Sequence, residues 1–310
     1  MSQKSALFSI GSGAALWGII GFFVTYLYNI GFTPAQVVSL RVLSASLLLG
    51  GYLLSKGRRY FKIKAGDSRY FIGTGIISIV LFNWCLFSAI EETSISVASI
   101  LLYTAPAFVT ILSRVIFKES FTMRKISALL ITFTGCSLVV GIIPHSDQSI
   151  SMYGLLLGLG SGLFYALYSI FGKFALQHYD SLTVTFYTFV FASIAVVPVS
   201  GLWNELPSFL SVSTWIYVLG LGLISTMLPF ILYTKGLSFV ESSKASIIAT
   251  IEPVVATLMG FLVFQEQLTF WQYAGVGLVI TAVIVVQESK KNSSAIHRET
   301  ERSTANQLQG

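Results

Sequence analysis

The segment TIEPVVATLMGFLVFQEQLT, residues 250–269, repeats the pattern of an earlier segment of the same chain, YTAPAFVTILSRVIFKESFT, residues 103–122. The shared positions, all at an offset of 147, are Pro106 and Pro253, Thr110 and Thr257, Phe117 and Phe264, Glu119 and Glu266, and Thr122 and Thr269. The same offset continues back without a gap to Tyr70 and Tyr217. This constant register predicts two copies of one unit, residues 1–145 and 146–288.

Composition indicates a membrane protein. Hydrophobic residues make up 54% of the 310 positions and charged residues only 10%, against about 25% charged residues in an ordinary soluble domain. Apolar runs of about 20 residues, the length that crosses a bilayer, recur along the chain. Ten such spans are predicted, at 7–28, 33–55, 69–89, 93–117, 122–143, 151–176, 180–202, 213–237, 241–264 and 269–287. Because the runs are continuous and not alternating, they indicate helices and exclude a β-barrel.

Charged side chains between the spans predict how the chain sits in the membrane. With the N-terminus in the cytoplasm, the cytoplasmic loops hold the lysines and arginines, beginning with the basic loop 56–69, whereas the outer loops hold acidic residues such as Glu91, Glu205 and Glu266. This is the positive-inside pattern, so both termini are predicted to be cytoplasmic, in a multi-pass protein of the plasma membrane. The net charge of +6 belongs to this pattern, and no nucleic-acid groove is predicted. Residues 289–310 are expected to form a disordered cytoplasmic tail.

Five spans in each unit imply that the two units enter the membrane from opposite sides. The loop KESFTMRK, 118–125, is basic, whereas its counterpart QEQLTFWQ, 265–272, has no cation. Likewise the basic loop 56–69 corresponds to the cation-free segment 203–212. The predicted fold is therefore an all-α membrane protein with ten transmembrane helices in two inverted five-helix repeats. Inverted repeats of this kind are characteristic of secondary transporters, whose substrate site lies near the midplane.

Two charged residues lie deep inside predicted spans. At about 1.5 Å per residue, Arg41 and Glu252 both lie near the middle of a hydrocarbon core of about 30 Å, so the two can meet. An isolated charge at that depth costs several kcal/mol, which pairing or protonation offsets. Three interpretations of Glu252 stay open: a structural pair or hydrogen-bonded acid, a group that binds or gates the solute, and a proton-coupling carboxylate.

Prolines interrupt three of the spans. Pro106, Pro229 and Pro253 cannot donate a backbone hydrogen bond, so each bends its helix and leaves a carbonyl of the preceding turn unpaired. Such carbonyls are tolerated at membrane depth where protein or water satisfies them, often around a cavity. Each proline is predicted to be either a static kink or a hinge.

Residues with an apolar body and a polar tip form the remaining candidates for a solute site. Such side chains suit an amphiphilic solute, although each can equally serve core packing. The candidates inside predicted spans are Trp17, Asn83, Tyr103, Tyr165 and Tyr168, together with Trp84, Tyr187 and Tyr233.

The segment EPVVATLMGFLVFQEQLTFWQYAGVGLVI, 252–280, resembles the EamA-type family of the drug/metabolite transporter superfamily. The residues that carry the resemblance are Glu252, Pro253, Gly260, Glu266, Gln272 and Gly275, with Arg41 in the second span. The first copy has Ala105 where the second has Glu252. The resemblance implies ten spans, a central cavity to which Trp17, Tyr103 and Tyr168 contribute, and a small-molecule permease of a family whose members are mostly exporters.

Motifs of other energy sources and chemistries are absent from the sequence. There is no P-loop and no HExxH or similar metal-ligand cluster, so no cofactor, no metal and no enzymatic activity are predicted. The predicted function is a secondary transporter that exports a small organic metabolite, such as an amino acid or related amphiphilic compound, by alternating access. Proton coupling is possible, membrane lipids are expected partners, and the chain is expected to be a monomer or homodimer. The alternative is a membrane-embedded lipid-handling protein, either a flippase or a lipid enzyme.

The inverted arrangement can be tested with reporter tags. A tag inserted in 56–69 and a tag inserted in 203–212 are expected on opposite sides of the bilayer, because the two loops follow equivalent spans of oppositely oriented units. Protease accessibility of each tag in intact and permeabilised cells is the measurement. Two tags on the same side would rule out the inversion.

Overall fold

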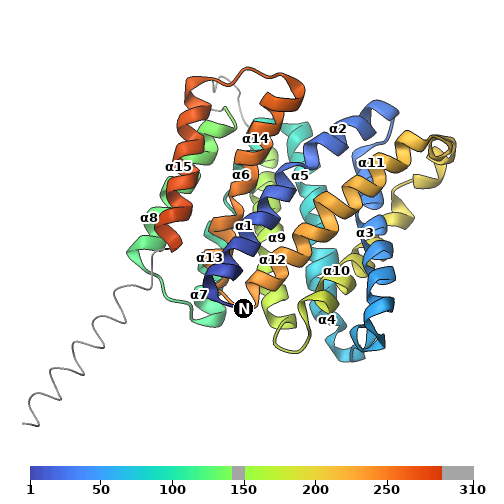
Figure 1. Ribbon diagram of the computed structural model, residues 1–310. Helices are drawn as coiled ribbons and strands as arrows, with labels where there is room; N and C mark the ends of the chain where they lie inside the picture. The colour runs from blue at the N-terminus through green and yellow to red at the C-terminus, as the bar shows by residue number, and fades with distance from the viewer. Residues whose placement is uncertain (142–150, 288–310) are drawn as a thin grey trace, which may run out of the picture.

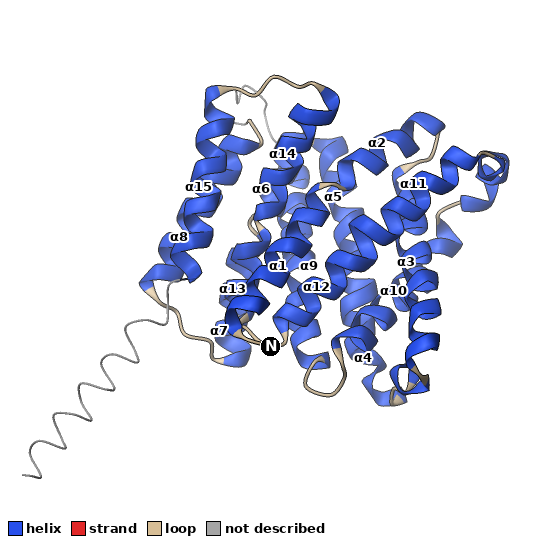
Figure 2. Cartoon of the chain, viewed as in Figure 1, coloured by secondary structure: helices blue, strands red, loops and turns tan. Residues whose placement is uncertain are grey.

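The computed structural model describes residues 1–141 and 151–287, and these residues fold entirely into helices and connecting loops (Figures 1 and 2). The all-α prediction is thereby confirmed. The predicted tail, 289–310, and the predicted junction between the two units at 145/146 lie outside the described residues.

The first half of the chain forms α1 to α8. The elements are α1 (Gln3–Gly18), α2 (Ile20–Ile30), α3 (Pro34–Lys56), η1 (Arg58–Phe61), η2 (Ala65–Asp67), α4 (Ser68–Phe71), the π-helix η3 (Ile72–Leu81), α5 (Phe82–Glu92), α6 (Ile95–Leu102), α7 (Ala105–Phe117) and α8 (Met123–Val139).

The second half forms α9 to α15. The elements are α9 (Met152–Ala175), α10 (Ser181–Val196), η4 (Val197–Val199), η5 (Leu202–Leu210), α11 (Val212–Gly222), the π-helix η6 (Leu223–Met227), α12 (Leu228–Leu237), α13 (Ser242–Ala249), α14 (Ile251–Phe264) and α15 (Phe270–Gln287).

Nine stretches of the described chain are long and apolar enough to cross a membrane, and they coincide with nine of the ten predicted spans. The tenth, predicted at 122–143, is α8, which has 17 residues. At about 1.5 Å per residue α8 is short for a hydrocarbon core of about 30 Å. It nevertheless packs along the whole of α15 (Figure 1).

Two spans stop and restart at mid-depth. The span Ile95–Phe117 breaks at Tyr103 and Thr104, between α6 and α7, and the span Ser242–Phe264 breaks at Thr250, between α13 and α14. A proline follows each break within the first turn of the new helix, where its missing N–H costs no hydrogen bond. Pro106 is the second residue of α7 and Pro253 the third of α14. Pro229 is the second residue of α12, directly after the π-helix η6.

Local features recur at the offset of 147 that the sequence shows. The π-helix η6 lies within the stretch that corresponds to the π-helix η3. Lys118 and Gln265, which are equivalent positions, end α7 and α14 in the same left-handed conformation, with φ of 56° and 57°. The next residues, Glu119 and Glu266, donate their backbone N–H to equivalent carbonyls, those of Ser113 and Gly260, at 3.3 and 3.2 Å.

Small residues let the helices approach one another closely. A Cβ at Gly275 of α15 would lie 2.7 Å from the carbonyl oxygen of Gly135 and 2.7 Å from the amide nitrogen of Val139, both on α8. On α9, a Cβ at Gly162 would lie 2.7 Å from Thr104 Oγ1 at the helix break. Close contact of this kind is the usual basis of helix association in membranes, where burial of apolar surface gives little driving force.

The connecting segments are divided between two faces of the bundle (Figure 1). The N-terminus, the segment 57–67 and the loop between α7 and α8 lie on one face, which we call the N-terminal face. The loop between α14 and α15 lies on the other, the distal face, where Gln272 Nε2 donates to Val139 O at 3.3 Å and Ser96 Oγ donates to Val140 O at 3.1 Å. The breaks of the two discontinuous spans lie between these faces.

Substitution of Gly275 by alanine is expected to destabilise the protein by about 1–3 kcal/mol, because the added methyl group has no room against the α8 backbone. Gly277 is the matched control: it lies on the same helix, and a Cβ there would meet nothing within 4 Å. Gly277→Ala is expected to leave the stability unchanged or to raise it by up to about 1 kcal/mol through helix propensity. Thermal melting of the purified variants in detergent is the measurement, and equal melting temperatures would contradict this account of the α8–α15 contact.

Candidate functional site

A cavity of about 210 Å³ lies among the helices near the helix breaks and extends toward the distal face. Its wall comes from both halves of the chain. At mid-depth it is lined by Trp17 of α1, Arg41 of α3 and Glu252 of α14, and toward the distal face by Tyr28 of α2 and Leu86 of α5. The site therefore requires elements that are more than 200 positions apart in the sequence.

Glu252 reaches the cavity because α14 starts at mid-depth. It is the second residue of α14, so its carboxylate lies in the first turn, where the helix dipole favours a negative charge. The phenolic O–H of Tyr165, on α9, donates to Glu252 Oε2 at 3.3 Å. Glu252 and Tyr165 also line a second, smaller cavity of about 20 Å³ that lies between the two helix breaks.

Arg41 enters the same cavity from α3. Its Nε donates to the hydroxyl of Thr226 at 3.1 Å, and Thr226 belongs to the π-helix η6. The guanidinium carbon lies 5.9 Å from the centre of the Phe230 ring, within the range of a cation–π contact. Arg41 and Glu252 share the cavity but do not form a direct ion pair with one another. The cavity thus presents a positive and a negative group separately.

Aromatic rings close the cavity toward the N-terminal face. The Trp17 ring packs edge-on against Phe230, with centroids 5.1 Å apart, and lies 5.2 Å from the Tyr233 ring. Tyr168 bonds to the hydroxyl of Thr234 at 2.6 Å, and Tyr233 to that of Ser169 at 2.7 Å. These bonds join α9 to α12 and hold the rings as a floor beneath the cavity.

One polar atom of this floor has no partner. The side chain of Trp17 is 5% exposed, and its indole Nε1–H meets no hydrogen-bond acceptor in the described part of the chain. A buried donor without an acceptor costs about 1–3 kcal/mol. Trp17 lines the cavity as a residue, but the Nε1 atom itself is buried, so its unmet hydrogen bond is a local cost of packing the ring against Phe230 and Tyr233.

Of the remaining candidates predicted from the sequence, some line a cavity and others lie elsewhere. Asn83 lines the cavity and donates its Nδ2–H to the carbonyl of Ile79 at 2.8 Å, whereas Tyr103 lines only the smaller cavity. Trp84, one residue from Asn83, is 58% exposed on the outside of the bundle. Tyr187 donates to the carbonyl of Phe61 at 2.8 Å and contributes to neither cavity.

Several cavity residues were not predicted from the sequence. Phe230, Phe82 and Phe87 supply much of the apolar wall, and Ser169 and Ser78 supply hydroxyl groups. A phenylalanine in a membrane span gives no signal of its own, because lipid and core favour it equally. Phe230 directly follows Pro229, which is the one feature of the sequence that marks this part of α12.

No group of three or more His, Cys, Asp or Glu side chains is close enough to hold a metal ion within 1–141 and 151–287.

Sequence comparisons relate this chain to a family of membrane transporters. A model of the EamA-like transporter family matches residues 4–141 and 152–287. A transporter of Archaeoglobus fulgidus is 30% identical over 279 residues, which cover 87% of this chain and 94% of its own. The Bacillus subtilis transporter YxxF is 27% identical over 94% of both chains, and the Salmonella typhimurium inner membrane transporter YicL is 23% identical over 95% of this chain and 99% of its own.

A solved crystal structure shares the fold. It superposes with a TM-score of 0.75 over 92% of this chain and 96% of its own, at 16% sequence identity. Identity at this level speaks for the fold alone.

The opening of the cavity toward the distal face can be tested by thiol labelling in a Cys85→Ala/Cys136→Ala background. Leu86→Cys is expected to react with a small water-soluble maleimide at least about tenfold faster than Ala89→Cys, because Leu86 lines the cavity whereas Ala89 is 0% exposed and reacts only on local opening. Labelling rates in proteoliposomes, followed by mass spectrometry, provide the comparison. Equal rates would show that the cavity is not reached by solvent.

Proposed function

Since this chain belongs to the EamA-like transporter family, we propose that it exports a small organic metabolite across the plasma membrane by alternating access. The proposed solute is an amino acid or a related amphiphilic compound. The protein is a multi-pass membrane protein with many apolar helices. It is therefore placed in the lipid bilayer, where such transport takes place.

The observation that carries this proposal is the pair of separated, opposite charges in one cavity. Arg41 and Glu252 both line it without pairing with one another. A zwitterionic solute would complement both groups: its carboxylate would accept from the Arg41 guanidinium, a favourable charge-assisted arrangement, and its ammonium would donate to Glu252.

The apolar wall of the cavity suits the rest of such a solute. Phe82, Phe87 and Leu86 line the distal part of the cavity, away from the aromatic floor. An apolar side chain of the solute would leave water for this wall, which is favourable by about 25 cal/mol per Å² of apolar surface. A cavity with two charged groups and an apolar wall is suited to an amphiphilic solute, whose charged groups would bind Arg41 and Glu252 and whose apolar part would contact the rings.

Alternating access is supported by the organisation of the bundle. The cavity extends toward the distal face and is closed toward the N-terminal face by the Trp17, Tyr168 and Tyr233 floor. Helix breaks, π-helices and left-handed helix ends recur at one offset, which supports the proposal of two equivalent, inverted halves. Such halves exchange an opening on one face for an opening on the other. Export is the direction that the family resemblance favours.

Glu252 is the group on which the proposed mechanism depends. The same carboxylate can hold either the ammonium group of the solute or a proton, so proton binding from outside would release the solute and drive the return of the empty carrier. Tyr165 orients the carboxylate by its hydrogen bond. We place Glu252 in solute binding and in proton coupling, and Arg41 in binding of the solute carboxylate.

A screen of amino acids and related amines in proteoliposomes, with and without a pH gradient, tests the proposal. Glu252→Gln is expected to reduce the uptake of the identified solute by about tenfold to a hundredfold, since a hydrogen bond to a charged group contributes about 1.5–3 kcal/mol, and to abolish its dependence on the pH gradient. Glu91→Gln removes one exposed carboxylate at the end of α5 and is the matched control.

Full transport by Glu252→Gln at every pH would leave Glu252 a structural role only. The same vesicles distinguish the lipid-handling alternative: a covalently altered lipid, or a labelled lipid moved between leaflets without movement of any solute, would overturn the proposal.

A further inference from the structure

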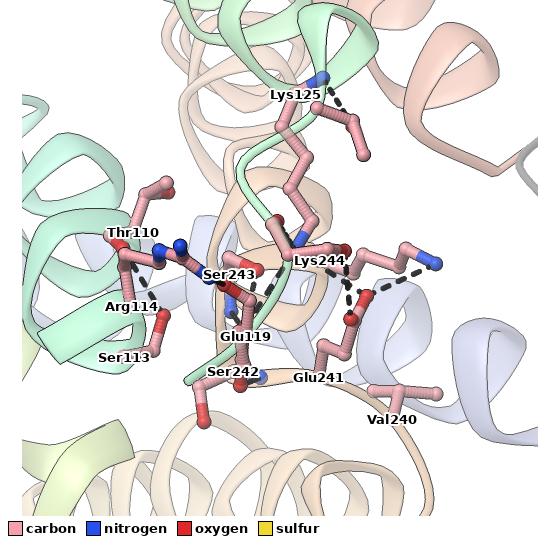
Figure 3. A network of polar contacts seen from close by, with 12 residues as sticks. Thr110, Ser113, Arg114, Glu119, Lys125, Val240, Glu241, Ser242, Ser243 and Lys244 are labelled. Carbon is pink, nitrogen blue, oxygen red and sulfur yellow. Dashed lines mark hydrogen bonds and ion pairs between the residues drawn. The ribbon is translucent and has the colours of Figure 1, made fainter. Parts of the chain in front are cut away.

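A network of charged side chains on the N-terminal face connects the two halves of the chain (Figure 3). Its centre is Glu119, which follows α7 and whose side chain is only 8% exposed. The Glu119 carboxylate accepts hydrogen bonds from the backbone N–H of Ser242 at 2.6 Å and of Ser243 at 3.1 Å, and from the Ser243 hydroxyl at 2.5 Å. Ser242 and Ser243 are the first two residues of α13.

Glu119 supplies the N-terminal cap that α13 does not have from its own residues. The first N–H groups of a helix have no acceptor within the helix, and the residue before α13, Glu241, makes no capping bond with its side chain. A carboxylate at this position both accepts these bonds and interacts favourably with the helix dipole. The helix it caps is one half of the broken span that continues into α14 and Glu252.

Two lysines, Lys125 and Lys244, lie beside this contact and interact with its carboxylates. Lys125, 3% exposed, lies 3.9 Å from Glu119 and 3.4 Å from Glu241, and Lys244 lies 3.1 Å from Glu241. Burial acts to raise the pKa of Glu241, but the hydrogen bond and charge of Lys244 and the charge of Lys125 outweigh it, so that this pKa is lowered. Lys173 of α9 donates to the carbonyls of Leu237 and Val240 at 2.8 and 2.6 Å.

The equivalent glutamate of the second copy, Glu266, is exposed and caps no helix in the described part of this structure. Glu266 follows α14 as Glu119 follows α7, with the same left-handed residue before it and the same backbone hydrogen bond. Yet Glu266 is exposed, and its carboxylate lies against Gly260 of α14 and accepts no hydrogen bond from the described residues. The positions that correspond to Ser242 and Ser243 are Ile95 and Ser96, which begin α6.

The start of α6 is accordingly left uncapped at these positions. Ser94 caps only the N–H of Val97, at 3.2 Å. Within the described chain the N–H groups of Ile95 and Ser96 have no acceptor, and the Ile95 side chain is 70% exposed. The glutamate contact is therefore made on the closed N-terminal face and not made on the distal face, toward which the cavity extends.

We propose that Glu119 and Glu266 are alternating latches of the transport cycle. With the N-terminal face closed, Glu119 caps α13, as in this structure. When the bundle opens to the N-terminal face, Glu119 leaves Ser242 and Ser243, and Glu266 caps α6 at Ile95 and Ser96. Each latch thus stabilises one closed face, and the pair balances the two states. This inference rests on the proposed alternating access.

Thiol labelling of two reporters, each in the Cys85→Ala/Cys136→Ala background, tests the latches. Leu86→Cys reports access from the distal face, because Leu86 lines the main cavity. Ser246→Cys reports access from the N-terminal face, because Ser246 lies one turn inside α13, is 5% exposed and lines the small cavity between the breaks. Proteoliposomes and a membrane-impermeant maleimide are used, without any solute.

Glu119→Ala is expected to raise the labelling rate of Ser246→Cys at least about tenfold and to lower that of Leu86→Cys, because the state closed on the N-terminal face loses its latch; tenfold corresponds to about 1.4 kcal/mol between the two states. Adding Glu266→Ala is expected to return both rates toward those of the parent, because both states then lack a latch. Glu91→Ala removes an exposed carboxylate at the end of α5, outside this network; it is the control and leaves both rates unchanged.

The double variant separates a switch from local loosening. If Glu119→Ala merely frayed the start of α13, Ser246→Cys would react faster, Leu86→Cys would not change, and Glu266→Ala would reverse nothing; that result would overturn the inference. Glu119→Gln, which keeps an acceptor oxygen but loses the charge, gives the same direction with a smaller change should Glu119→Ala fail to fold. Since neither rate depends on a transported solute, failure of the latches and failure of the transport proposal are separate observations.

Discussion

Satisfaction of backbone hydrogen bonds inside the hydrocarbon is the constraint on which this structure depends. A helix can stop at mid-depth only where protein or a water-filled cavity takes up its freed polar groups, and both broken spans stop where the two cavities lie. The break at Thr250 makes Glu252 a first-turn residue of α14 and points its carboxylate into the cavity. The start of α13 raises the same problem at the membrane surface, and there Glu119 resolves it.

Duplication supplies a symmetric scaffold, and the departures from symmetry supply its chemistry. Glu252 corresponds to Ala105, and Arg41 corresponds to Thr188, which is buried and donates to Thr74 at 2.7 Å. Each charge of the cavity therefore comes from one copy only. Glu119 and Glu266, by contrast, are the same residue in both copies and differ in their surroundings: the Glu119 carboxylate caps α13, whereas the Glu266 side chain is exposed.

Span positions were predictable because they follow from local composition. The runs predicted at 33–55 and 151–176 are the helices Pro34–Lys56 and Met152–Ala175. The break at Ile19 between α1 and α2 was not predicted, although Gly18, the last residue of α1, was a usable signal directly before it. Trp17 and Trp84 looked alike in the sequence, yet one lines the cavity and the other is exposed. In a membrane both the lipid-facing and the core-facing side of a helix are apolar, so amphipathic periodicity does not tell them apart.

By itself, the sequence determined that the chain is an all-helical membrane protein, where its spans lie and in which register its two copies correspond, because hydrophobic length and repeat offset are properties of contiguous residues. Only the tertiary structure decided that Arg41 bonds to Thr226 and shares a cavity with Glu252 without pairing to it. It also decided that Tyr103 faces a different cavity and that Glu119 is buried where Glu266 is not. These outcomes depend on how closely helices that are far apart in the chain approach one another. Two copies of one motif acquire different neighbours only when the bundle assembles, so the sequence of the motif does not show the difference.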